Sequence, residues 1–200
     1  MTKIPLSDLL REINQCQQCA DHLPLPPRPI VQIHPSARLL IIGQAPGTRV
    51  QATGIPWNDA SGTRLRRWLG LTEKVFYNPE QVAIMPMGFC YPGKGKSGDL
   101  PPRPECAPHW HQRLLEQMPQ VELILLIGQY AQQRYLTPEF LRQYKTLTER
   151  VYHSDELAEP FWLLPHPSPR NHQWRQNNPW FETERLAALQ QRIHTLFQHT

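Results

Sequence analysis

The sequence predicts an α/β fold in three layers, in which helices cover both faces of a central, mostly parallel sheet of four strands. Two observations predict it. Short apolar runs alternate along the chain with segments of helical spacing. The most apolar run, residues 121–128, is uninterrupted after Glu122, which is typical of a strand covered on both faces. Such alternation favours parallel strands joined by helical crossovers.

The first half of the chain contributes two strands and two helices to this prediction. Leucine and isoleucine at helical spacing predict a helix over residues 6–16. An apolar run predicts a strand over residues 38–42, which ends in a glycine- and proline-bounded loop. Residues 61–69 have the pattern of a capped helix, and residues 82–85 that of a second strand. A long proline-rich loop follows, and a loop of that length in a compact domain indicates a function.

The second half continues the alternation. The expected helices cover residues 107–118, 129–135, 138–144 and 179–197, and the expected strands cover residues 121–128 and 161–165. The last helix has an apolar stripe that includes Phe181, Leu189 and Ile193. Residues 39–42 and 161–164 both stop abruptly in loops that carry polar side chains. Ligands in open α/β sheets bind outside the carboxyl ends of strands, so these two loops are the first candidates for a site.

Length and composition narrow the class of protein. Two hundred residues suffice for one α/β domain, so residues 1–200 are expected to form a single domain. The net charge of +4 is compatible with a polyanionic partner. The N-terminus does not resemble a signal peptide, and no apolar run reaches membrane-spanning length, so we expect a cytoplasmic protein without a membrane partner. No spare apolar stripe is evident, and a monomer is therefore expected.

The four cysteines have a spacing that metal sites use. Cys16 and Cys19 form a CxxC pair, and Cys90 and Cys106 are joined by a proline-stiffened loop. Thiolates that converge from a CxxC turn and a loop can hold zinc or a [4Fe-4S] cluster. Four unrelated buried thiols are the alternative, and the spacing alone gives the two interpretations about equal weight.

Polar residues gather in the loops after the two exposed strand ends. His166 follows one strand between two prolines, with Ser168, Arg170 and Asn171 close behind it, and such donors suit an anion or a developing negative charge. A lone histidine at a strand end is more often structural. Trp57 is either a lid on the core or a stacking surface for a planar ligand. Asp59 and Asp99 could each position a water molecule or cap a helix.

Basic residues are concentrated in or beside these loops, and this bias favours a phosphate track over an ordinary solvated face. They are Arg49, Arg64, Arg66, Arg67, Lys94, Lys96, Arg103, Arg170 and Arg175.

Four motifs in register resemble the uracil-DNA glycosylase superfamily. Residues 43–47 (GQAPG) are similar to the GEAPG of the iron-sulfur family 4 enzymes and share the GQ start of the family 1 motif GQDPYH. Residues 166–171 (HPSPRN) have the form seen in single-strand-selective monofunctional uracil glycosylases. Residues 54–57 (GIPW) stand where family 4 has G-x-P-F, and the cysteines follow the family 4 pattern. The resemblance runs from Cys16 to Asn171.

The resemblance implies a uracil-DNA glycosylase-like fold, a [4Fe-4S] cluster on the four cysteines and a DNA repair enzyme of the base excision type. Such an enzyme flips a base out of single- or double-stranded DNA and hydrolyses its N-glycosidic bond, which leaves an abasic site. The roles that it implies are base stacking for Trp57, base or water contacts for Gly43, Gln44 and Ala45, a hydrogen bond to the departing base for His166, water positioning for Asp59, intercalation for Arg170, and phosphate contacts for Ser168 and Asn171.

Two departures from the family pattern concern the substrate. Gln44 stands where family 4 has glutamate, so this side chain can orient a water molecule but cannot act as a general base. Pro86 stands where family 4 has the asparagine that reads the edge of uracil. Without that amide the protein is expected to discriminate uracil less sharply, or to prefer another deaminated or damaged base.

The departures leave two further hypotheses open. One is a catalytically weak DNA protein of the same fold that binds a lesion or traps an abasic site. The other is a zinc-stabilised α/β protein that binds a nucleotide or phosphate ligand at the same strand ends. The protein should be brown if it carries an iron-sulfur cluster and colourless if it carries zinc.

Overall fold

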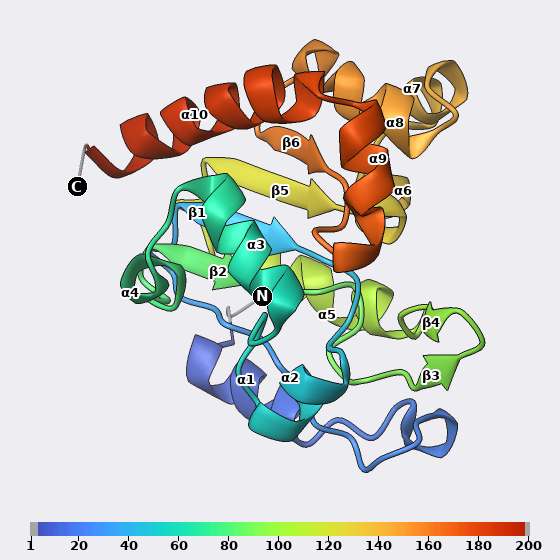
Figure 1. The fold of residues 1–200 in the computed structure, drawn as a ribbon. Helices are drawn as coiled ribbons and strands as arrows, with labels where there is room; N and C mark the ends of the chain where they lie inside the picture. Colours follow the sequence, from blue (N-terminus) through green and yellow to red (C-terminus); the bar gives the residue numbers. More distant parts are fainter. Residues whose placement is uncertain (1–3, 199–200) are drawn as a thin grey trace.

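The structure, a computed structural model, describes residues 4–198. Four parallel strands form its central sheet in the order β2-β1-β5-β6, as Figure 1 shows. The strands are β1 (Leu39–Ile42), β2 (Val82–Ile84), β5 (Leu123–Ile127) and β6 (Phe161–Leu164). Helices lie on both sides of the sheet, so the predicted three-layer fold is confirmed.

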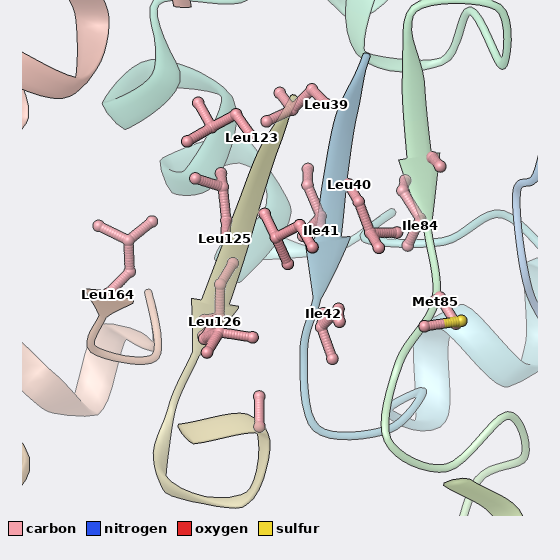
Figure 2. Packing of buried hydrophobic residues seen from close by; sticks show 14 of the residues in the cluster. Leu39, Leu40, Ile41, Ile42, Ile84, Met85, Leu123, Leu125, Leu126 and Leu164 are labelled. Atoms are coloured by element: carbon pink, nitrogen blue, oxygen red, sulfur yellow. The ribbon is translucent and has the colours of Figure 1, made fainter. Parts of the chain in front are cut away.

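The two central strands are the most apolar segments of the chain. Every residue of β1 and β5 is buried, because neighbouring strands flank them on both edges and helices cover both faces. In the register of the sheet, Leu40 lies between Ala83 of β2 and Ile124 of β5. Figure 2 shows apolar side chains of β1 beside those of β2 and β5, among them Leu40, Ile84 and Leu125. This packing fixes the strand ends at which the polar loops begin.

The longer helices begin and end close to the predicted residues. They are α1 (Leu6–Asn14), α3 (Ala60–Leu69), α5 (Cys106–Leu115), α6 (Gln129–Tyr135), α7 (Pro138–Gln143) and α10 (Ala187–Gln198). The expected C-terminal helix has a π-helical start over Phe181–Leu186. Asp59 caps α3, and Gly70 ends it in the left-handed conformation that glycine adopts without strain.

Several short elements were not predicted. They are the helices α2 (Thr48–Thr53), α4 (Glu73–Phe76), α8 (Leu147–Tyr152) and α9 (His172–Asn177), and the hairpin of β3 (Lys94–Gly95) and β4 (Gly98–Asp99). In Figure 1 the hairpin and α9 lie at the end of the molecule toward which the strands point. No helix within residues 4–198 has both the length and the apolar character needed to cross a bilayer.

Candidate active site

A cleft of about 440 Å³ opens beyond the carboxyl ends of β1, β2 and β6. Most of the predicted site residues line it, although they come from segments far apart in sequence. Those that line it are Gly43, Gln44, Ala45, Trp57, Asp59, His166, Ser168 and Arg170. Asn171 supports the cleft from behind, because its Nδ2 donates a 2.7 Å hydrogen bond to the carbonyl oxygen of His166. The sheet therefore brings the two predicted loops to one place.

Trp57 covers the turn that follows β1. Its backbone φ of 56° is unusual for a residue with a bulky side chain, so the surrounding structure must hold it there. A Cβ atom at Gly43 would lie 2.7 Å from Cζ2 of the indole, and one at Gly62 would lie 1.7 Å from the Trp57 carbonyl oxygen. Both positions need glycine, because Trp57 occupies the space that a side chain would fill.

His166 faces Trp57 across the cleft. The two ring centroids are 5.7 Å apart, and the rings are tilted by 33°. Burial lowers the pKa of His166, and Asp59 raises it to a smaller extent. The imidazole is therefore neutral at pH 7 and can donate one N–H into the cleft without carrying a formal charge.

Two carboxylates flank Gly47 at the mouth of the cleft. Oδ1 of Asp59 accepts a 2.8 Å hydrogen bond from the Gly62 amide, which caps α3. A Cβ atom at Gly47 would lie 3.3 Å from Oδ2 of Asp99 and 4.0 Å from Oδ2 of Asp59. Burial raises the pKa of Asp99, while Arg170 lowers it and Asp59 raises it. Asp59 thus caps a helix with one oxygen and leaves the other on the cleft side.

The β3–β4 hairpin forms one wall of the cleft, which the sequence did not reveal. Nη1 of Arg170 donates a 2.7 Å hydrogen bond to the carbonyl oxygen of Ser97. A Cβ atom at Gly98 would lie 2.7 Å from the same nitrogen, so glycine is needed at this close approach. Nε2 of Gln44 donates to the Leu100 carbonyl oxygen at 3.3 Å. Arg170 and Gln44 therefore hold the hairpin against the cleft.

Pro86 lines the floor of the cleft where an asparagine was expected from the family pattern. Its carbonyl oxygen faces away, toward buried His111 on α5, and accepts a 3.0 Å hydrogen bond from His111 Nε2. Because Nε2 donates, Nδ1 accepts from the Tyr135 hydroxyl at 2.6 Å. Burial lowers the pKa of His111 to about 4. This neutral histidine fixes the end of β2 and was missed by the sequence analysis.

The four cysteines line a single small cavity of about 20 Å³, which lies between the segment after α1, the loop after β2 and α5. All four are free thiols. The pKa of Cys90 is raised to about 11 and that of Cys106 to about 12, mainly by burial and to a smaller extent by the neighbouring thiols. The predicted convergence of Cys16, Cys19, Cys90 and Cys106 is thus present in the structure.

Zinc and a [4Fe-4S] cluster hold four thiolates differently. One tetrahedral zinc ion would hold its sulfurs about 3.8 Å apart, given Zn–S bonds of about 2.3 Å. In a [4Fe-4S] cluster each thiolate binds a different iron, so the sulfurs stand farther apart. Within residues 4–198, no three His, Cys, Asp or Glu side chains form a grouping that could hold a metal ion. The structure thus brings the four thiols to one cavity without forming a closed metal site.

The family follows from a comparison with known proteins. A model of the uracil DNA glycosylase superfamily matches residues 30–190, which is most of the chain. The chain belongs to this superfamily. A candidate uracil DNA glycosylase from Methanosarcina acetivorans, solved by NMR in solution, is similar at 18% identity and a TM-score of 0.45, covering 80% of this chain and 94% of that one. The cleft described above thus lies in a member of the uracil DNA glycosylase superfamily.

Proposed function

We propose that this superfamily member is a monofunctional DNA glycosylase that removes uracil or a related deaminated or damaged base. The observation that carries the proposal is the pairing of Trp57 with a neutral His166 across one cleft at the strand ends. A base inside a duplex cannot reach such a cleft, so the nucleotide is extruded or is taken from a single strand. The indole then stacks on the base, and the backbone of Gly43 and Ala45 borders its edge.

Bond cleavage places opposite charges on the two products. The N-glycosidic bond breaks with its electron pair on the departing base, and positive charge develops on the sugar. The N–H of His166 donates to a base oxygen and stabilises the negative charge that develops on the base. A water molecule attacks the sugar carbon and gives its proton to the carboxylate of Asp59, with Gln44 orienting it. The products are the free base and an abasic site.

The floor of the cleft suggests the base preference. Pro86 offers no side-chain amide to the Watson–Crick edge of a base, and its carbonyl oxygen is already bonded to His111. Discrimination between bases rests largely on such paired polar groups. We therefore propose that the enzyme accepts several deaminated bases, including hypoxanthine, with a smaller preference for uracil than an asparagine would give.

The test is a base-release assay on single- and double-stranded oligonucleotides that carry uracil, hypoxanthine, xanthine or an alkylated base, followed by alkaline cleavage of abasic products. We expect His166→Leu to lower the rate by about 100-fold or more, because it removes the donor to the leaving base while keeping a side chain of similar size. Its melting temperature should stay close to that of the wild type. Base release at the wild-type rate by this variant contradicts the proposed role.

A second candidate function has its own observation. Gln44 and Pro86 replace the two family 4 side chains that act on water and on uracil, which favours a protein that binds a lesion or traps an abasic site. Tight binding without base release across the whole panel would support this alternative. Release of any base in the panel, dependent on His166, excludes it.

We also propose that the four cysteines hold a [4Fe-4S] cluster. The convergence of four free thiols on one cavity supports it. When bound, the cluster would cross-link the N-terminal CxxC segment to the loop after β2. A colourless protein that contains zinc after anaerobic purification would instead support a zinc-stabilised fold.

A further inference from the structure

A second, cationic cavity lies beside the cleft. It has a volume of about 260 Å³ and is enclosed by α3, α9 and the helical segment that runs into α10. Its charged lining consists of Arg64 and Arg67 from α3, Arg175 from α9 and Glu182. Three guanidinium groups thus face one carboxylate, and the folded chain concentrates positive charge here.

The partners of these arginines leave most of their N–H groups free. Arg64 donates to the carbonyl oxygen of Pro167 at 3.1 Å, and Arg175 pairs with Glu182 at 3.2 Å and lies 3.4 Å from Nδ1 of His172. Nε of Arg175 is buried and has no hydrogen-bond partner in the described chain. The guanidinium of Arg67 forms no hydrogen bond or ion pair with any residue of 4–198, and only its backbone carbonyl oxygen accepts, from Gly70 and Gln190. A buried donor without a partner is costly, so a ligand that accepts from it would be stabilising.

The positive charges of Arg64, Arg67 and Arg175 also repel one another. Burial lowers the pKa of Arg64, and the nearby charges of Arg175 and Arg67 lower it further. Arg67 lies in the last turn of α3, where the helix dipole favours a positive charge only weakly. That interaction does not explain why Arg64 and Arg175 converge on the same cavity. A bound anion would offset the repulsion among all three.

We infer that this arginine cavity binds a phosphate group, namely a backbone phosphate of the DNA strand whose base enters the cleft. The guanidinium fork matches phosphate oxygens in geometry and in charge. At about 30 Å³ per water molecule, the cavity has room for a tetrahedral oxyanion. Arg64 reaches from the cavity to Pro167, the residue after His166, so a phosphate here lies along the path of a strand that leaves the cleft.

The inference rests on the proposed function only in taking DNA as the ligand, and its test does not require base release. The affinity for a labelled single-stranded thymine oligonucleotide is measured as a function of salt for the wild type, Arg67→Gln and Arg11→Gln. Arg11 is an exposed residue of α1 and controls for the loss of one positive charge. The melting temperature of each variant shows that it is folded.

We expect Arg67→Gln to weaken binding by about 10-fold at low salt, and to reduce the slope of log K against log salt by about 0.7. Arg11→Gln should leave the slope unchanged. Equal slopes for the two variants overturn the inference. If the wild type releases no base but the slopes still differ, the proposed function fails while the phosphate site stands.

A second arm distinguishes DNA from a free phosphate compound. Inorganic phosphate is added at constant ionic strength without DNA, and the melting temperature is recorded. An unchanged melting temperature together with different slopes assigns the cavity to a backbone phosphate. A rise in the wild type that is absent from Arg67→Gln, together with equal slopes, overturns the DNA assignment in favour of a small phosphate ligand.

Discussion

At the scale of single residues, Trp57 depends on two neighbours that have no side chain. An added methyl at Gly43 would overlap the indole, which would have to move out of the cleft. We predict that Gly43→Ala lowers the rate of base release by about 10- to 100-fold, because small displacements of a positioning group are costly. Single-turnover assays on the preferred substrate measure the loss.

A rescue variant controls this prediction. Phenylalanine lacks the outer part of the indole that contains Cζ2, so Gly43→Ala combined with Trp57→Phe should release bases faster than Gly43→Ala alone. A double variant that is slower than both single variants would show that the added methyl acts elsewhere than on the indole.

Asp59 combines two roles, and two substitutions separate them. Asparagine caps helices about as well as aspartate, whereas alanine costs about 1 kcal/mol. We predict that Asp59→Asn keeps the wild-type melting temperature and loses about 100-fold in rate, because the amide cannot take the proton of the water molecule. Asp59→Ala should lose both rate and stability. Full activity in Asp59→Asn would indicate that Asp99, which lines the same cleft, accepts the proton of the water molecule instead.

At the scale of elements, His111 joins three of them. It lies on α5 and hydrogen-bonds to the end of β2 and to Tyr135 of α6. Its pKa is lowered from 6.5 to about 4 in the folded state, so between these values the unfolded chain binds a proton that the folded chain does not. Stability therefore rises with pH over this window and is lost as the pH falls through it, by at most about 3 kcal/mol.

Melting curves between pH 7 and pH 4 measure this contribution. The wild type should lose more stability than His111→Gln over this range, since glutamine can bridge the same groups but does not titrate. A parallel loss in both proteins would assign the acid sensitivity to other groups.

The predictable elements are those with a strong internal pattern. β1 and β5 were predicted because their residues are apolar without interruption, and α3 because its apolar face repeats at helical spacing. The short helices α4 and α8 carry no such stripe, and threonine caps at Thr72 and Thr146 define them instead. The β3–β4 hairpin was missed because its strands of two residues each are held by Arg170, which is distant in sequence.

The same distinction applies to the sites. The cleft and the cysteine cavity were predictable because short motifs contain their residues and parallel strands bring their loops together. The arginine cavity was not, because Arg64, Arg67 and Arg175 converge only when α3, α9 and α10 pack. The hydrogen bond between His111 and the Pro86 carbonyl oxygen likewise depends on tertiary packing, which no local sequence pattern indicates.

At the scale of the whole molecule, the cysteines join segments far apart in the chain. A group held by Cys16, Cys19, Cys90 and Cys106 would close long loops and so contribute to folding. We predict that Cys90→Ser abolishes the brown colour and lowers the melting temperature by about 5 °C or more. Arg103→Gln, which alters the cavity wall without removing a thiol, should keep the colour. Unchanged colour in Cys90→Ser would refute the cluster.

The contact between Arg170 and Ser97 makes the hairpin a reporter of DNA engagement. If Arg170 enters the base stack, the hairpin loses one tether, and the exposed Lys94 and Lys96 are cleaved faster by trypsin because the hairpin opens more readily. Nicking at these lysines should then accelerate when DNA is added, in a variant that binds but releases the base slowly, such as His166→Leu. Slower nicking would mean instead that DNA covers the hairpin while Arg170 stays in place. The rate of trypsin digestion thus shows whether Arg170 breaks its hydrogen bond to the carbonyl oxygen of Ser97 when DNA binds.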